Sequence, residues 1–357
     1  MERKNNNRKK LTSLIFLLFI TIVMLGAATY AWFTANRIVT IHPIDVEIVA
    51  VGGLQISADA FEWKAFLSND DILNAHTRFV VPDNSINQMP LAMEPVSSVG
   101  DVSGGRMHMF FGTVVQDIDN DFALWTERTL DRRGRIGHYI AFDMFLRLDS
   151  SEAAGEWIYL TRNSHVSPSI GAQDRGVQNA ARVAWVLPYD TAANASNAMP
   201  VESALGDLQA QTVDTAFIWE PNYDTHTPNG INNAFFRQGI TTLPPSGGPA
   251  LVYDGVHAEI PLAQAVKLGD AWGTGGNPFR AGGPHPEFPQ YFRRVVPDYR
   301  TNSGFAATAS NIQAFRLRPG VTKVRMYMWI EGQDVDCENN ASGTDIQFSV
   351  QFSLTAD

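Results

Sequence analysis

The segment 346–354 alternates strictly between apolar and polar residues, and this alternation constrains the fold more than any other sequence feature. Ile, Phe, Val, Phe and Leu occupy the even positions, with Gln or Ser at every odd position between them. Residues two apart share a face of a β-strand, so the segment predicts a strand with one apolar and one polar face. The same period recurs at 44–50, 140–148 and 324–330. Each of these segments can therefore place one face on a core and the other in solvent, including the face that carries Asp143.

These segments and several shorter ones predict an all-β fold. The shorter candidates lie at 107–114, 157–160, 181–186 and 312–317. About ten strands with polar connections that contain Gly and Pro are typical of two packed sheets, and we expect a jelly-roll-like β-sandwich with long irregular loops.

The domain organisation follows from the same pattern. We expect a single domain over 34–357, because no internal repeat or change of composition marks a second boundary. Loop insertions are expected near 164–178, 192–211 and 269–289, where polar residues, Gly and Pro replace the alternation.

A charge-free apolar segment precedes this domain. Residues 11–33 contain no charged side chain, and five Lys or Arg residues stand among the first ten positions. As a helix these 23 residues would extend about 34 Å, enough to cross a bilayer, with the positive end in the cytoplasm. We therefore expect residues 1–33 to be a signal peptide or a membrane anchor that exports the domain to the cell surface. The small residues before Ala31 are typical of a signal-peptidase site, which would lie between Ala31 and Trp32.

The net charge differs between the N-terminus and the rest of the chain. The first ten residues carry a net charge of +4, and the remainder has 22 basic and 36 acidic residues. An acidic domain of this kind is a poor partner for phosphate backbones, so nucleic-acid binding is excluded from the expected functions. The single cysteine, Cys337, rules out an intrachain disulfide.

Six short segments share features with one known family. They are Ala27–Thr34, Tyr139–Leu146, Ile158–Leu160, Ala181–Ala184, Trp219–Asn222 and Met326–Asp334. Together they resemble the TasA and camelysin family of exported Firmicutes surface proteins. The resemblance implies a jelly-roll domain, export through a dedicated signal peptidase, and a role in extracellular fibres or a biofilm matrix.

The same resemblance implies a way in which copies of the chain could join. In TasA-like fibres, a freed N-terminal segment completes the sheet of a neighbouring subunit. The matching stretch here would be 32–44, with Ile38, Val39 and Ile41 as its apolar residues. An extended apolar segment can satisfy a sheet edge, although Pro43 would interrupt the strand. The alternative is that this stretch forms the first strand of its own domain.

Motifs that carry catalysis are absent from the sequence. There is no H-E-x-x-H zinc motif and no G-x-S-x-G nucleophile elbow, and the eight histidines stand singly. The oxygen-bearing residues Asp117, Asp119 and Asp121 alternate as in a calcium loop. However, Phe122 and Arg128 replace the Gly and Glu that such a loop requires. We therefore expect no cofactor, with calcium at this turn as the one alternative to an ordinary solvated loop.

The sequence thus predicts a non-enzymatic structural protein of the cell surface or extracellular matrix, whose partners would be copies of itself in a fibre. If the N-terminal helix is not cleaved, it would also hold the chain in the membrane. Two other functions stay open. One is a monomeric surface module that binds a glycan or a protein, and the other is a metal-dependent hydrolase whose ligands converge from distant strands.

Overall fold

The structure, a computed structural model, describes residues 44–51, 53–75, 87–103, 106–116, 122–129, 136–149, 155–187, 215–222, 225–228, 253–267, 288–295, 311–317, 319–334, 336–337 and 343–355. The chain divides into two compact units, 1–38 and 39–357, and every described residue belongs to the second.

The first sheet joins the two ends of the described chain. Its strands are β1 (Ile44–Val51), β3 (Phe66–Leu67), β12 (Glu156–Leu160), β13 (His165–Pro168), β19 (Ile312–Leu317) and β21 (Ile346–Ser353). They follow the order β19-β12-β21-β1-β3, and β13 also pairs with β21. Strand β1 runs parallel to β21 from Ile44↔Ile346 to Val51↔Ser353, whereas the other pairings in this sheet are antiparallel.

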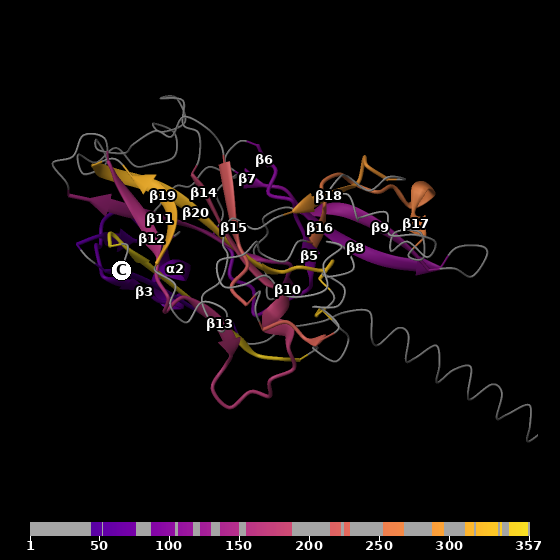
Figure 1. The fold of residues 1–357 in the computed structure, drawn as a ribbon, viewed down its shortest axis with the longest axis horizontal. Helices are drawn as coiled ribbons and strands as arrows, with labels where there is room; N and C mark the ends of the chain where they lie inside the picture. The colour runs from indigo at the N-terminus through magenta and orange to yellow at the C-terminus, as the bar shows by residue number, and fades with distance from the viewer. Residues whose placement is uncertain are drawn as a thin grey trace, which may run out of the picture. The chain divides into compact units, whose positions relative to one another are not determined.

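The second sheet is antiparallel throughout its described strands. They are β2 (Gln55–Ser57), β11 (Ile140–Leu148), β14 (Ala181–Leu187), β15 (Thr215–Trp219) and β20 (Gly320–Ile330). The order is β15-β14-β20-β11-β2, which places β20 between β14 and β11 (Figure 1).

A third sheet has the order β17-β9-β8-β5. Its strands are β5 (Val96–Ser97), β8 (Met109–Gln116), β9 (Phe122–Thr129) and β17 (Val266–Lys267). Three further pairs are β4 (Ala92–Met93) with β10 (Ile136–Gly137), β6 (Val102–Ser103) with β7 (Arg106–Met107), and β16 (Tyr253–Val256) with β18 (Phe292–Val295). The described helical segments are short: α2 (Asn69–Ala75), η1 (Val177–Ala180) and η3 (Leu262–Gln264).

The largest core lies between the first and second sheets. Alternate residues of β21, such as Phe348 and Phe352, pack in one buried cluster with alternate residues of β11 and β20. Its aromatic centre is formed by Trp185, Phe315 and Phe352, with ring centroids 5.6–6.1 Å apart. The period of two in the sequence therefore builds this core, because each strand contributes one face to it.

The second sheet is also buried on its other face. Tyr139, Ala141, Tyr327 and Trp329 pack there against a second cluster that includes Met109 of β8. The expectation that this face meets solvent is therefore wrong for β11 and β20. Sequence period alone does not reveal a third layer, because polar and aromatic residues on a strand face can be covered by other segments.

A buried ion triad explains how charged residues are tolerated on that face. Asp143 and Arg325 are register partners on β11 and β20, and Arg325 Nη1 lies 3.0 Å from Asp143 Oδ1. Lys323 Nζ lies 3.0 Å from the other carboxylate oxygen. Asp143 is 6% exposed and Arg325 is 2% exposed. Opposite charges on adjacent strands thus compensate each other where water is excluded.

The described residues confirm the all-β expectation. Strands at 140–148 and 312–317 occur with the predicted bounds, and the segment 107–114 is divided between β7 and β8. The stretch 164–178, expected to be a loop, contains β13 and the start of η1. The expected insertions at 192–211 and nearly all of 269–289 lie outside the described residues.

Candidate functional site

A cluster of buried charged residues lies where three strands of the second sheet meet. Arg182 is the second residue of β14, Glu220 directly follows β15, and Asp334 lies four residues beyond β20. Because β14 is antiparallel to both neighbours, its beginning lies beside the ends of β15 and β20. The sheet topology therefore brings together residues that are far apart in sequence.

Arg182 lies at the centre of this charge cluster. Its Nη2 lies 2.8 Å from Glu220 Oε1 and 2.5 Å from Asp334 Oδ2, and its side chain is 1% exposed. Its Nη1 donates hydrogen bonds of 3.0 Å to the backbone carbonyls of Asn179 and Ala181. One guanidinium group thus compensates two carboxylates and fixes the backbone at the start of β14.

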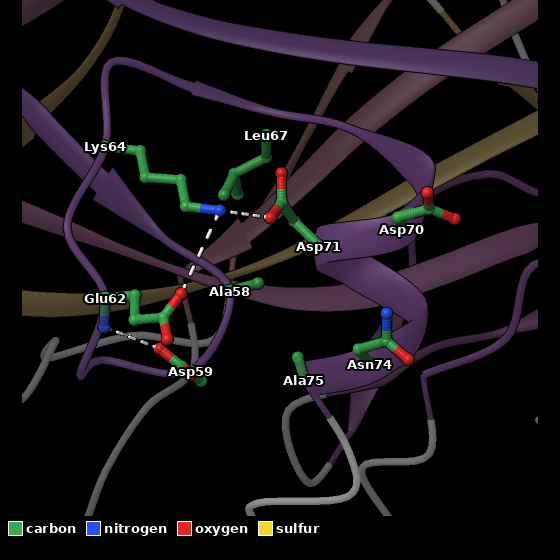
Figure 2. A pocket seen from close by; sticks show the side chains of 9 residues that line it. All are labelled: Ala58, Asp59, Glu62, Lys64, Leu67, Asp70, Asp71, Asn74 and Ala75. Atoms are coloured by element: carbon green, nitrogen blue, oxygen red, sulfur yellow. Dashed lines mark hydrogen bonds and ion pairs between the residues drawn. The ribbon is translucent and has the colours of Figure 1, made fainter.

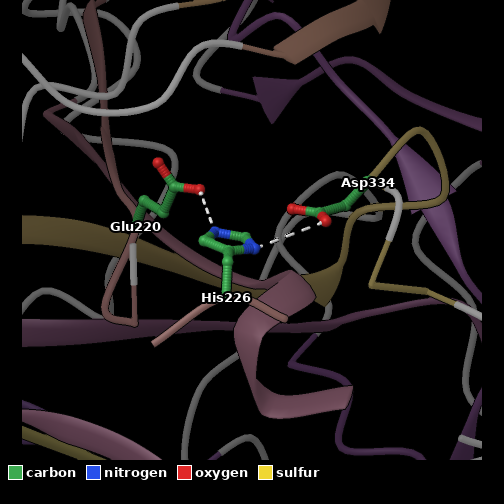
Figure 3. Close-up of side chains that lie close together, drawn as sticks. All are labelled: Glu220, His226 and Asp334. Atoms are coloured by element: carbon green, nitrogen blue, oxygen red, sulfur yellow. Dashed lines mark hydrogen bonds and ion pairs between the residues drawn. The ribbon is translucent and has the colours of Figure 1, made fainter. Parts of the chain in front are cut away.

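His226 lies between carboxylates on both edges of its ring (Figure 3). Its Nε2 is 3.1 Å from Glu220 Oε1, and its Nδ1 is 2.9 Å from Asp336 Oδ2 and 3.8 Å from Asp334 Oδ1. A ring with an acceptor at each nitrogen is satisfied only when both nitrogens donate, so this histidine is an imidazolium.

The electrostatics agree with that protonation state. Burial by itself lowers the pKa of His226, but the charge of Asp334 and the hydrogen bonds to Asp336 and Glu220 outweigh burial and raise the pKa to about 10. Desolvation opposes ionisation of Asp336 as well, yet its hydrogen bond and charge interaction with His226 hold its pKa below the usual value. The two groups stabilise each other's charged forms.

The same cluster fixes the loop that follows β15. Asp336 accepts hydrogen bonds from the backbone N–H of Thr227, at 2.9 Å, and from the Thr227 hydroxyl. Cys337 follows directly, and burial, reinforced by the charges of Asp334 and Glu331, raises the pKa of its thiol. Deprotonation of this thiol is therefore disfavoured, which makes the cysteine a poor nucleophile.

A second buried carboxylate, Glu331, lies at the end of β20 and is 0% exposed. Its Oε2 accepts a 3.1 Å hydrogen bond from the Trp329 indole and its Oε1 accepts one of 3.1 Å from the Gln333 backbone. Burial raises the pKa of Glu331 to about 7, against the opposing hydrogen bonds and the charge of Arg182. Several ionisable groups are therefore held out of water at this end of the second sheet.

The residue types Glu220, His226 and Asp334 are also those of a metal site, since one ligand atom from each lies within 4.8 Å of the others. Their orientation does not suit an ion. Glu220 lies at Nε2 and Asp334 at Nδ1, so no single ring nitrogen faces both carboxylates (Figure 3). Arg182 already contacts both carboxylates. A tetrahedral metal needs its donors to converge on one point, and the arrangement instead forms a compensated charge cluster.

A second acidic group surrounds a cavity of about 190 Å³ beside α2 (Figure 2). Ser68 and Asp71 form a capping box at the start of this helix, in which Asp71 Oδ2 accepts a 2.9 Å bond from the Ser68 backbone. Lys64 pairs with Asp71, and Asp59 Oδ1 accepts 2.9 Å bonds from the backbone of Phe61 and Glu62. These contacts have a structural role, because they hold the 58–65 loop together and tie it to the start of the helix.

Sequence spacing did not identify the charge cluster. His226 stands alone in the sequence, far from both Arg182 and Asp334. In the structure the side chains of Asp334 and Asp336 are 6% and 0% exposed. The one available signal was the presence of Glu220 and Asp334 within the segments that carry the family resemblance.

The residues to which the sequence assigned functions lie outside the described part of the chain. These are the calcium-loop residues Asp117, Asp119 and Asp121, the cleavage residues Ala31 and Trp32, and the donor-strand residues Ile38, Val39 and Ile41. The apolar segment 11–33 lies outside it as well. Among the helices that the structure describes, none has the length and apolar character needed to span a bilayer.

Comparison with known proteins yields no match to a family model, to a curated protein or to a solved structure.

Proposed function

We propose that the protein is a non-enzymatic structural subunit of the cell surface or extracellular matrix, with a jelly-roll-like body, whose copies join by exchanging the first strand. The observation that carries this proposal is the parallel pairing of β1 with β21. The two strands stand at opposite ends of the described chain and pair over eight residues of β1. No hairpin connects them, so the strand beside β21 can come from the same chain or from another copy.

The contacts of β1 are suited to such an exchange. Ile48 and Ala50 are buried in the core between the two sheets, next to residues of β21. Removal of β1 would expose the backbone edge of β21 and open an apolar groove, which favours refilling by an identical strand. Gly53, with φ of +91°, lies between β1 and β2, where the chain passes from the first sheet to the second.

Export is the second component of the proposal, and the sequence supports it. A basic N-terminus followed by 23 uncharged residues would direct the acidic domain out of the cytoplasm. Strand β1 begins at Ile44, a short way along the chain after this segment, so membrane attachment and strand exchange would both involve the N-terminal part of the chain. An uncleaved chain would be tethered at its exchanging strand, and cleavage would free that strand for assembly.

Cysteine pairing across the β1–β21 register tests the exchange. Val49 and Gln351 are register partners and are partly exposed. Two full-length chains, Val49→Cys and Gln351→Cys, each with Cys337→Ser, are exported from one bacterial host and oxidised. Strand exchange predicts disulfide-linked heterodimers, and the double variant Val49→Cys/Gln351→Cys predicts a ladder of covalent oligomers together with fibres in electron micrographs.

The β8–β9 hairpin supplies a matched control. Thr113 and Trp125 are register partners on strands that follow each other in the chain. Single-cysteine variants at these positions should give no heterodimer when mixed. Exclusively intrachain disulfides in the Val49→Cys/Gln351→Cys double variant, with no heterodimer from the mixed single variants, would refute strand exchange.

A metal-dependent hydrolase receives no support from the buried cluster, because Glu220 and Asp334 lie at opposite edges of the His226 ring.

A further inference from the structure

The side chain of Glu331 lies where the end of β20 meets β5. Val96 and Glu331 form a parallel bridge, and the Gly332 N–H donates a 2.8 Å hydrogen bond to the Val96 carbonyl. Strand β20 belongs to the second sheet and β5 to the third. Glu331 therefore lies at the seam between these two sheets.

The Glu331 carboxylate accepts hydrogen bonds from both sides of this seam. Its Oε2 accepts one of 3.1 Å from the Trp329 indole of β20 and a longer one of 3.4 Å from the Ser98 N–H, directly after β5. The Ser97 hydroxyl of β5 donates to the same carboxylate. The Ser97 oxygen in turn accepts a 3.0 Å hydrogen bond from the Val256 N–H of β16. One carboxylate thus connects β20, β5 and β16, which belong to three different groups of paired strands.

Water is excluded from this seam. Glu331 and Ser98 are 0% exposed, and Tyr253 of β16 is 4% exposed. Gly255, also on β16, approaches so closely that a Cβ atom there would lie 2.5 Å from the Ser98 carbonyl oxygen. The charge of an ionised Glu331 can therefore be stabilised only by the protein groups around it, and burial of a charge without a partner is costly.

The charged groups of this region provide no cation for Glu331 alone. Among the described residues no cation forms an ion pair with it, and Arg182 attracts it only from a greater distance. Arg182 instead contacts Glu220 and Asp334. An ionised Glu331 would add to an existing excess of carboxyl groups over cations, since the buried charge cluster consists of Arg182, His226, Glu220, Asp334 and Asp336.

The pKa of Glu331 lies in the neutral range, in contrast to other groups around it. Burial raises this pKa to about 7, and the hydrogen bonds and Arg182 offset burial only in part. Burial lowers the pKa of Arg182 and of His226, but neighbouring carboxylates outweigh burial and raise both, so these two groups stay cationic between pH 5 and 8. Burial raises the pKa of Tyr253 and of Cys337, so both stay neutral over the same interval.

We propose that Glu331 is a pH-dependent lock between the second and third sheets, in which the neutral acid holds β5 and β16 against β20 and ionisation loosens them. The neutral acid keeps a carbonyl oxygen as an acceptor without the cost of a buried charge. Opening of the seam admits water, and a solvated carboxyl group is ionised at neutral pH. The closed state thus binds the proton more tightly than the open state does. Its advantage is complete below about pH 4.5 and is lost as pH rises towards 7.

Hydrogen–deuterium exchange of the full-length chain in detergent tests the lock. Peptides that contain Ser98, Val256 and Gly332 are followed by mass spectrometry from pH 5 to pH 8, with labelling times scaled to the chemical exchange rate. Complete solvation of Glu331 on opening predicts about 70-fold less protection of these amides at pH 8 than at pH 5. Peptides of β12, in the first sheet, serve as an internal reference and should change much less.

Three variants assign the effect to the carboxyl group. Glu331→Gln keeps the shape but cannot ionise, so protection of the seam should no longer change with pH. Glu127→Gln makes the same change at an exposed position on β9 and should keep the pH dependence of the unaltered chain. Ser97→Ala removes a donor that stabilises the ionised carboxylate, so the pH at which protection stops falling should rise, even if Glu331→Gln fails to fold.

Four results would overturn the proposal. They are seam protection that does not change with pH, a change that persists in Glu331→Gln, a pH profile of Ser97→Ala that stays in place or moves to lower pH, and a parallel loss of protection in β12. Strand exchange involves the first sheet, to which β5, β16 and β20 do not belong, so its failure leaves these outcomes unaffected.

Discussion

Replacement of Arg182 by methionine should destabilise the domain more than any exposed charge change. Methionine keeps much of the volume but removes the guanidinium that lies 2.8 Å from Glu220 and 2.5 Å from Asp334. Two buried carboxylates then lose their shared cation, and the carbonyls of Asn179 and Ala181 lose a donor. Breaking a buried ion pair from one side costs about 3–5 kcal/mol. For a domain of this length that cost should lower Tm by about 4–7 °C.

The pH dependence of this loss distinguishes charge from packing. Without Arg182 the two carboxylates share only the His226 imidazolium. Acid pH reduces the remaining excess of buried negative charge, so the deficit should be larger at pH 8 than at pH 5. The measurement is urea unfolding of the full-length chain, followed by tryptophan fluorescence at both pH values. Arg175→Met, the same change at an exposed arginine, should alter the free energy of unfolding by less than about 0.5 kcal/mol. A deficit for Arg182→Met that is below about 1 kcal/mol, or equal at both pH values, would contradict this account of the cluster.

Three other predictions concern single ionisable groups. In the folded protein the pKa of His226 is raised to about 10. The stability that its protonated ring contributes is therefore complete below about pH 6.5 and is lost as pH rises towards 10. The destabilisation by His226→Gln should shrink over that interval, and a destabilisation that does not change with pH would count against the imidazolium. Asp143→Asn leaves Arg325 and Lys323 without their carboxylate and should cost about 3 kcal/mol. Burial alone would raise the pKa of Asp143, but these two cations outweigh burial and lower it. The difference in free energy of unfolding between Asp143→Asn and the unaltered chain, measured by urea unfolding, should therefore disappear as pH falls below about 4. Burial raises the pKa of Cys337. An aromatic disulfide reagent at pH 8 should therefore leave this thiol unmodified in the native protein and modify it in concentrated urea. Rapid modification of the native protein would contradict this expectation.

The strands were predictable because their signal is local. At 140–148 and 346–353, the apolar or polar character of each residue indicates the face of the strand on which it lies. The structure has strands at these positions. The covering of the second sheet was not predictable in the same way. Asp143 looks like a solvent residue until its register partner Arg325, 182 positions away, is known.

The charge cluster was hidden for a related reason. Glu220 and His226 are near each other in the chain, but Arg182 and Asp334 reach them only because β14, β15 and β20 are neighbours in one sheet. Motif spacing detects ligands that share a helix or a loop, and it cannot detect residues that converge from strand ends.

The parallel alignment of β1 and β21 also determines how the domain responds to a pulling force. A membrane anchor would hold the chain at the beginning of β1, and a load on the C-terminus would act at the end of β21. In a parallel pair these two points lie at opposite ends of the ribbon, so traction slides one strand along the other instead of peeling them apart. All the cross-strand hydrogen bonds along β1 then carry the load together, and this loading geometry gives the domain high mechanical resistance.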